Sequence, residues 1–391
     1  MRFLSGLISL ALLATPLQAA TLETDISPKM AEMGCTARLS GPIETGDLER
    51  IAPVLETSPT GGFDDPDFRP DVIFRQFSPA LDYAPDAIFT HRVCLNSAGG
   101  SLVEALRFVG YIQDQSSDRS GGPAGIQTAI ARDDTCNGAC ALVFLAGRFV
   151  RFSGNPAYEG RSNFILHPKG RLSLHAPAID LTQDSYSPET ARQIWEVGMQ
   201  ASARIAAMIA GGGLFMSEGL FAEMLAHPAD DPLVLDTVEQ AVRWGVDVEP
   251  NVLNYGRYPY AQEQFFDAIC RNSRSQAPAH LDLQPGSGAM TLTRNGEVMR
   301  STGAFVDART GRPYECEINA GQWEEFQSWL YPDGYGGGQM PRLRFSCYNA
   351  RVTLVSQVEC YDCDVDIELG CMGILPPDVP IADIYMDPPL P

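Results

Sequence analysis

The chain has 391 residues, 45% of them hydrophobic, and its formal net charge is −21 at pH 7. This length suffices for two domains, the first of them large enough to bury a sizeable core. Phosphate backbones and anionic lipid headgroups repel such a chain, which argues against nucleic acid and membrane surfaces as partners.

The first 20 residues have the pattern of a signal peptide. Arg2 precedes the apolar run Phe3–Leu13, and the small residues Ala19 and Ala20 suit a signal peptidase site. The run is shorter than the roughly 20 residues that span a bilayer. We therefore expect residues 1–20 to be cleaved, giving a periplasmic or secreted protein without stable membrane insertion.

Within residues 35–250, short apolar runs alternate with helical patterns, as is typical of an α/β layer architecture with parallel strands. The expected strands are 36–39, 91–95, 127–131, 164–166 and 171–175. The expected helices are 46–54, a helix directly after Gly99 and Gly100, 139–146, 188–210, 217–226 and 237–244. The stretch 56–86 is rich in Pro, Asp and Gly, which indicates a surface insertion.

Local signals refine three of these helices. Ser101 and Glu104 have the spacing of a capping box. Gly147 is expected to cap the C-terminal end of the helix 139–146. The helix 188–210 places these apolar residues on one face: Ile194, Val197, Ala201, Ile205 and Met208.

The chain changes character after about residue 255. Short β-like runs such as 289–293 and 351–357 alternate with Gly and Pro turns, and long helical patterns are lacking. We expect a small β-rich, Cys-containing domain over 256–375. Six prolines in the last sixteen residues predict an extended tail over 376–391.

The ten cysteines are an even number, which in an exported chain favours disulfides. The candidates are Cys35, Cys94, Cys136, Cys140, Cys270, Cys316, Cys347, Cys360, Cys363 and Cys371. Cys136 and Cys140 are four residues apart, a separation that permits a disulfide around a first helical turn. The alternative is a free reactive thiol there. Cys360 and Cys363 would fit half of a zinc site or a redox pair, but structural disulfides are the favoured interpretation.

Two predicted helix starts carry glycine, one within Asn96–Leu102 and one within Cys136–Gly147. A helix N-terminus leaves backbone N–H groups without intrahelical partners at its positive end. If the strands bring both ends together, these groups can stabilise a negatively charged oxygen, as in an oxyanion hole.

Four elements occur in a recognisable order: Arg38–Ile43, Asn96–Leu102, Cys136–Gly147 and Arg171–Pro177. With them, residues 35–248 resemble the ClpP/crotonase superfamily, in particular an exported, periplasmic ClpP-like branch. The resemblance implies a spiral of ββα units, followed here by the second, smaller β-rich domain, which lies outside it. Family members often assemble as rings or trimers, so an oligomer is compatible with the resemblance.

The resemblance also implies a site. ClpP-like serine peptidases have serine at the position of Gly138 and histidine at that of His175. Their oxyanion N–H groups map onto Gly100, with Gly99 beside it, and onto Ala139. A third, acidic member is not assigned, because the spacing of Asp230, Asp231 and Asp236 does not match.

Glycine offers no nucleophile, and losing a triad serine removes roughly six orders of magnitude in turnover. We therefore expect a relative that is not a peptidase and that binds a peptide or protein, with no cofactor and no metal. One alternative is an active hydrolase that uses Cys136, Cys140, Ser97 or Ser101. Another is a crotonase-like enzyme that stabilises an oxyanion without serine, and a third is an assembly or adhesion component. His175 would otherwise be structural, and His167, before a proline, a turn residue.

Overall fold

The computed structural model describes residues 19–56, 91–115, 125–149, 161–178, 187–248 and 262–275, then shorter segments up to residue 384. These segments are 283–285, 291–296, 298–307, 313–319, 350–356, 365–369, 373 and 375–384. Most of the predicted signal peptide, nearly all of the predicted insertion and four cysteines lie outside the described residues. These cysteines are Cys347, Cys360, Cys363 and Cys371.

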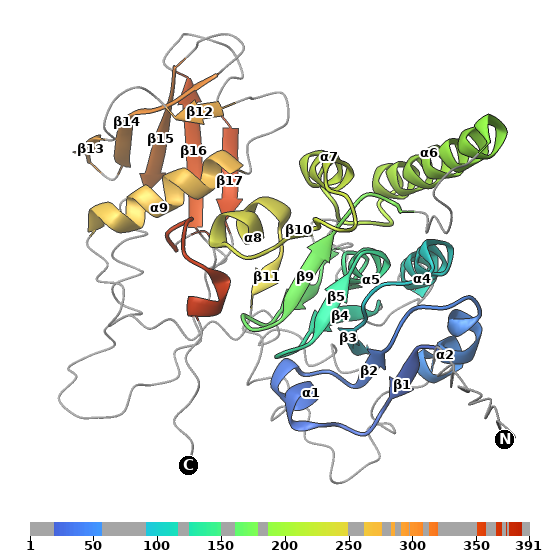
Figure 1. Ribbon diagram of the computed structural model, residues 1–391. Coiled ribbons are helices and arrows are strands. Elements are labelled where there is room, and N and C mark those ends of the chain that lie inside the picture. Colours follow the sequence, from blue (N-terminus) through green and yellow to red (C-terminus); the bar gives the residue numbers. More distant parts are fainter. Residues whose placement is uncertain are drawn as a thin grey trace, which may run out of the picture.

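The first sheet has six strands in the order β1-β2-β3-β4-β8-β11 (Figure 1). They are β1 (Thr21–Glu23), β2 (Ala37–Ser40), β3 (Arg92–Asn96), β4 (Gln127–Ile130), β8 (Phe164–Leu166) and β11 (Asp247–Val248). Strand β1 is antiparallel to β2, and every other neighbouring pair is parallel. All of β4 and β8 is buried, as expected of parallel strands covered on both faces. The predicted mixed α/β architecture is confirmed.

Seven helices are described up to residue 248. They are α1 (Pro28–Met33), α2 (Asp47–Leu55), α4 (Leu102–Gln115), α5 (Ala139–Phe144), α6 (Pro188–Ala210), α7 (Glu218–Ala226) and α8 (Val238–Trp244). Every side chain of α5 is buried, which agrees with its almost wholly apolar sequence. Helix α1 begins where Ser27 caps it and ends at Gly34 in the left-handed conformation.

A second sheet, ordered β10-β9-β5, carries the chain into α5. Its strands are β5 (Thr135–Asn137), β9 (Arg171–Leu174) and β10 (Leu233–Val234), and β5 runs parallel to β9. Strands β8 and β9 therefore belong to different sheets, although only a short turn joins them. Two further short strands, β6 (Arg148–Phe149) and β7 (Arg161–Ser162), pair with each other.

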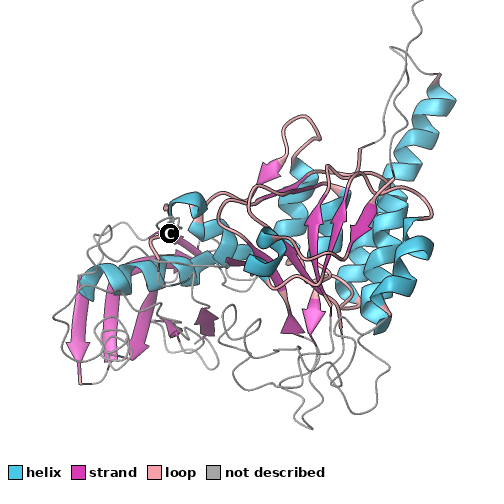
Figure 2. Cartoon of the chain, turned by 90° about the horizontal axis from the view of Figure 1, so that it is seen from below, coloured by secondary structure: helices cyan, strands magenta, loops and turns pink. Residues whose placement is uncertain are grey.

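The C-terminal part contains an antiparallel sheet with helix α9 (Gln262–Ser275) lying across it (Figure 2). Its strands are β12 (Leu283–Pro285), β13 (Thr291–Asn295), β14 (Val298–Asp307), β15 (Pro313–Asn319), β16 (Ala350–Ser356) and β17 (Val365–Leu369). A disulfide between Cys270 and Cys316 ties α9 to β15. The expectation that this part lacks a long helix was wrong, because α9 has 14 residues and buries Phe266, Ile269 and Cys270.

The predicted Pro-rich tail is packed, not extended, over its described residues. Val379, Ile381 and Ile384 are buried, and the last two lie in a 3₁₀ turn, η5 (Ile381–Ile384). The backbone N–H groups of Val238 and Glu239, at the start of α8, donate to carbonyls of this segment. The helix N-terminus thus finds acceptors in the tail, an arrangement that local sequence does not encode.

Of two predicted helix caps, the capping box at Ser101 is half formed, and the cap at Gly147 is absent because Leu145 caps α5. The Ser101 hydroxyl accepts a hydrogen bond from the N–H of Glu104, but the reciprocal half of the box is absent. The Glu104 carboxylate is buried and instead accepts from the N–H of Leu48, in the first turn of α2. Gly147 has no positive φ; a Cβ there would lie 2.1 Å from the Thr128 hydroxyl, so close packing is what favours glycine.

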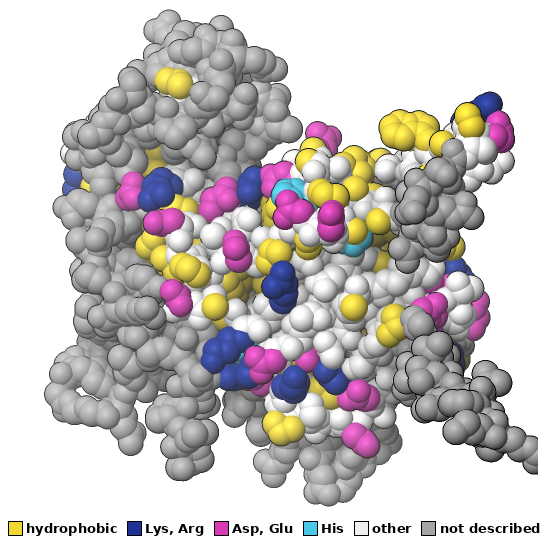
Figure 3. Space-filling view, in the orientation of Figure 1, with side chains coloured by type: hydrophobic (Ala, Val, Ile, Leu, Met, Phe, Trp, Pro, Cys, Tyr) yellow, Lys and Arg dark blue, Asp and Glu magenta, His cyan; other side chains and the backbone are white. Residues whose placement is uncertain are grey.

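The apolar face of α6 is largely uncovered. The helix extends away from the rest of the described fold (Figures 1 and 2), and apolar side chains gather on its surface (Figure 3). Val197, expected on the apolar face, is 55% exposed, and Trp195 is 70% exposed. Within α6, Ile205 alone is fully buried. At the opposite side of the first sheet, charged side chains gather over α1, where Lys29 and Arg38 both pair with the buried carboxylate of Asp134 (Figure 3).

Candidate functional site

The first of two glycine turns lies between β3 and α4. Gly99 and Gly100 have φ values of 109° and 131°, which side chains rarely adopt. The N–H of Ile43 donates to Gly99, and the N–H of Ser101 donates to Ile43. A Cβ on Gly100 would lie 2.2 Å from the Ile43 carbonyl oxygen. The backbone of this turn is therefore pressed against Ile43 and leaves no room for any other residue.

The second turn joins β5 to α5 at Gly138, which has φ 53° and ψ −113°. Its N–H donates to the Ser173 carbonyl over 3.0 Å, so that amide is already occupied. The predicted disulfide between Cys136 and Cys140 is present, and both cysteines are fully buried. It closes a short covalent loop around Gly138, and neither cysteine is a free thiol.

The two turns are adjacent. Ser97 and Cys136 form a parallel bridge, in which the N–H of Ser97 donates to Thr135. A Cβ built on Gly99 would lie 3.7 Å from the backbone nitrogen of Ala139. Among the described residues, no hydrogen-bond acceptor takes the N–H of Gly100 or of Ala139. The two sequence-mapped amides thus lie in neighbouring turns, both without a protein acceptor.

His175 follows β9 and lies against the second turn. A Cβ on Gly138 would lie 2.4 Å from Nε2 of His175. The imidazole therefore fills the space that a side chain at position 138 would need. Its Nδ1 is 2.8 Å from the Ala176 carbonyl oxygen, which only accepts hydrogen bonds. In the neutral ring Nδ1 hence carries the proton, and the lone pair of Nε2 faces the Gly138 turn.

No described carboxylate bonds to His175. The three aspartates considered from sequence, Asp230, Asp231 and Asp236, make no hydrogen bond to His175, whose Nδ1 bonds to the Ala176 carbonyl instead. The place where an acid would orient the ring is taken by the Ala176 carbonyl. That carbonyl fixes the tautomer, which is half of what a triad acid does.

The alternative nucleophiles are all engaged. The buried Ser97 hydroxyl donates to the Gly99 carbonyl and accepts from the Gly99 N–H. Ser101 caps α4. The hydroxyl of Ser173, which sequence reasoning missed, bonds to Asn137 over 2.5 Å. Its partner is 36 residues away, so no local signal marks it.

His167 is a separate, fully buried residue at the start of the turn between β8 and β9. Its Nδ1 accepts from the N–H of Lys169, and its Nε2 is 3.6 Å from Glu32. Burial lowers the pKa of His167 to about 4, although Glu32 opposes this shift. The ring is therefore neutral at pH 7 and belongs to the turn, as its sequence context indicates.

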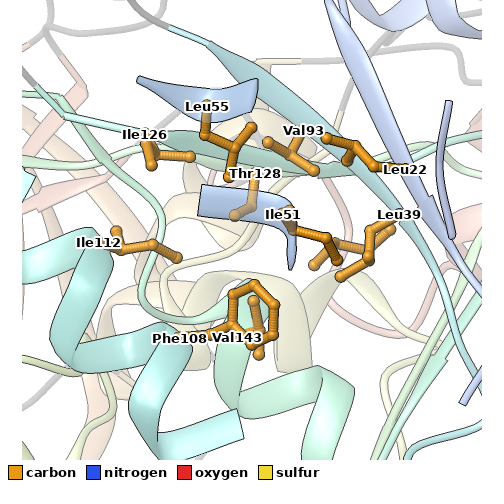
Figure 4. A pocket seen from close by; sticks show the side chains of 11 residues that line it. Leu22, Leu39, Ile51, Leu55, Val93, Phe108, Ile112, Ile126, Thr128 and Val143 are labelled. Carbon is orange, nitrogen blue, oxygen red and sulfur yellow. The ribbon is translucent and has the colours of Figure 1, made fainter. Parts of the chain in front are cut away.

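The described residues contain no group of three His, Cys, Asp or Glu side chains placed to hold a metal. A small cavity of about 20 Å³ lies in the core between the first sheet and α2, α4 and α5 (Figure 4). Its lining is apolar apart from Thr128 and includes Leu22, Ile51 and Phe108. A void of this size is a packing defect and contacts neither glycine turn.

Within the described residues, no helix combines the length and the apolar character needed to cross a bilayer. The three disulfides, Cys35–Cys94, Cys136–Cys140 and Cys270–Cys316, fit an oxidising compartment.

No protein-family model and no curated protein matches this chain. Among solved structures, a serine-to-alanine mutant of 1510-N membrane-bound stomatin-specific protease is a weak neighbour, with a TM-score of 0.26 and 13% sequence identity. The match covers 47% of this chain and 68% of that one. A likeness at this level carries no argument about function.

Proposed function

We propose that this chain is an exported ClpP-like protein without serine-peptidase chemistry, which binds a carbonyl or carboxylate oxygen of a peptide through the N–H groups of Gly100 and Ala139. One observation carries the proposal: the imidazole of His175 occupies the space in which a nucleophile at position 138 would lie. The turns that carry the two amides are nevertheless fixed. Hydrogen bonds to Ile43 hold the first turn, and the Cys136–Cys140 disulfide holds the second.

The chemistry of the site supports binding over turnover. Two N–H groups in fixed positions can donate hydrogen bonds to a partly or fully negative oxygen without any reacting atom from the protein. Gly100 is exposed and Ala139 is 9% exposed, so the proposed ligand approaches from the side of Gly100. The four candidate nucleophiles Ser97, Ser101, Cys136 and Cys140 each have another task.

The test removes one donor with little change in shape. Ala139 is the first residue of α5, a position where proline is well tolerated, so Ala139→Pro deletes the N–H and preserves the helix start. We expect peptides selected from a random library to bind this variant about tenfold more weakly, as for one lost hydrogen bond. The matched control, Ala139→Ser, keeps the N–H and should bind normally. Binding that is identical in all three proteins would contradict the proposed site.

Catalysis is tested by comparing the native chain with His175→Ala. Broad peptide and ester substrates should show no hydrolysis that depends on His175, measured against His175→Ala. Hydrolysis that disappears in this variant would replace the binding proposal with an active hydrolase.

A second candidate rests on the lone pair of Nε2 that faces the turn. An imidazole base beside two free amides suits an enzyme that removes a proton next to a carbonyl group and stabilises the resulting enolate. This candidate predicts His175-dependent exchange of carbonyl α-protons into deuterated water, observed by NMR. Pure binding predicts none.

A further inference from the structure

Ala20 is part of the folded core. Its side chain is fully buried, in the same apolar cluster as Ala37 and Leu39 of β2. Its N–H donates to Oδ2 of Asp47 over 3.2 Å, and its carbonyl accepts from Arg50 over 2.6 Å. Both backbone polar groups and the methyl group of this residue are therefore used by the fold, although the sequence places it at the end of a predicted signal peptide.

The partner, Asp47, is 2% exposed and lies in the first turn of α2. Its Oδ2 also accepts the N–H of Glu44 over 2.8 Å, and its Oδ1 pairs with the half-exposed Arg50. Glu44 follows Ile43, whose backbone fixes the Gly99 and Gly100 turn. One carboxylate thus links residue 20 to the segment on which the candidate site is built.

We propose that the exported chain is cut between Ala19 and Ala20, and that the new α-ammonium group of Ala20 pairs with the Asp47 carboxylate. Water adds to the Ala19 carbonyl, the Ala19–Ala20 peptide bond breaks, the leader departs with a C-terminal carboxylate, and the released amine takes up a proton. An α-amino group with an ordinary pKa of about 8 is protonated at pH 7. The inference rests on the export that is part of the proposed function.

The geometry selects this bond over its neighbour. A cut after Ala19 leaves a small residue at the end of the leader and keeps every contact of Ala20. A cut after Ala20, the boundary expected from sequence, would remove the buried methyl group, the Asp47 donor and the Arg50 acceptor together. It would also place the new terminus at the exposed Thr21, on the edge strand β1.

Cleavage is expected to strengthen the hydrogen bond between Ala20 and Asp47 electrostatically. Before the cut, Asp47 accepts from a neutral amide; afterwards it accepts from an ammonium group at the same position, and hydrogen bonds between opposite charges are about twice as strong. Because Arg50 is half exposed, solvent screens its charge, and the Asp47 carboxylate can also interact favourably with a second cation.

The first experiment reads the terminus directly. The full chain is expressed in a bacterium that exports it, and the intact mass of the exported protein is measured. We expect the mass of a chain beginning at Ala20. A chain that is exported but begins at Thr21, or at any residue other than Ala20, overturns the inference while leaving the binding proposal in place. A chain that stays in the cytoplasm uncut overturns the inference together with export.

The second experiment tests the pair. Chains beginning at Ala20, with free or acetylated α-amine, are compared by denaturant unfolding in the native sequence and in Asp47→Asn. Acetylation should lower the folded-to-unfolded ratio about tenfold in the native sequence and leave it nearly unchanged in Asp47→Asn. An equal effect in both backgrounds overturns the pair.

A further variant avoids any change at Asp47, in case Asp47→Asn does not fold. One glycine placed before Ala20 keeps the positive charge but moves it away from the carboxylate. We expect this chain to be destabilised about as much as the acetylated one. Stability equal to that of the chain beginning at Ala20 overturns the pair independently of the asparagine variant.

Discussion

Both glycine turns of the candidate site lie between a strand and a helix, but a different group excludes a side chain from each of them. At Gly100 the obstacle is the backbone of Ile43, which is held by hydrogen bonds on both sides. At Gly138 the obstacle is the imidazole of His175, a side chain that can move. The first glycine is therefore a requirement of the fold, whereas the second depends on which side chain occupies one small space.

This difference separates two parts of the site. The part built from backbone, around Gly100 and Ala139, is held by the hydrogen bonds of Ile43 and by the Cys136–Cys140 disulfide. The part built from side chains has no nucleophile at Gly138, and the His175 imidazole fills the space that a side chain there would need. Under the proposed function, the backbone part binds the ligand and the side-chain part does not react with it.

The largest effect is expected for Gly100→Ala. The new Cβ meets a carbonyl oxygen at 2.2 Å and cannot adopt φ 131° without strain, which together should cost about 4 kcal/mol of unfolding free energy. The matched control is Gly245→Ala at the end of α8, where φ is also positive but no atom lies within 4 Å of the new Cβ. Backbone strain alone should cost the control about 1 kcal/mol. Urea unfolding that gives equal losses would contradict the close packing at Ile43.

A smaller and conditional effect is expected for Gly138→Ala. Strain and the contact with His175 should cost about 2 to 3 kcal/mol. In a His175→Ala background the contact is absent, and the loss should shrink by about 1 kcal/mol. A double-mutant cycle measures this coupling. Additive losses would mean that the ring does not occupy the space at position 138.

The smallest effect is the pH dependence of stability that comes from His167, which is distinct from His175 of the candidate site. Its pKa falls from about 6.5 in the unfolded chain to about 4 in the folded one because of burial. Below pH 6.5 the unfolded chain therefore binds the extra proton, and stability declines as the pH falls toward 4. At pH 6 the loss should be about 1 kcal/mol. His167→Asn, which keeps an acceptor for Lys169, should lack this decline; an unchanged decline assigns it to another group.

Much of the first part of the fold could be predicted because its signals are local. Apolar runs and helical spacing located β3, β4, α4 and α6 to within a few residues. The expectations that were wrong depend on distant partners: Glu104 serves α2 instead of its own helix, and residues 375–384 pack on α8. Helix α9 was missed because Phe266, Ile269 and Cys270 lie in a segment otherwise rich in polar residues.

For the site, the two glycine-bearing helix starts were predicted from the residues themselves, and His175 was proposed only through the resemblance. The sequence could not show that the imidazole enters the Gly138 turn, since this depends on the path of the chain after β9. Nor could it show that the Ala176 carbonyl stands where an acid was sought. Backbone acceptors carry no sequence signature.

The disulfide between Cys35 and Cys94 joins residues 59 positions apart, one just before β2 and one within β3. The whole stretch 57–90 falls inside this covalent ring. A protease that nicked the chain there would produce two pieces that remain a single molecule, held by sulfur and by the parallel pairing of the two strands. The ring thus lets that stretch be cut, lengthened or exchanged in evolution while the parallel pairing of β2 and β3 stays intact.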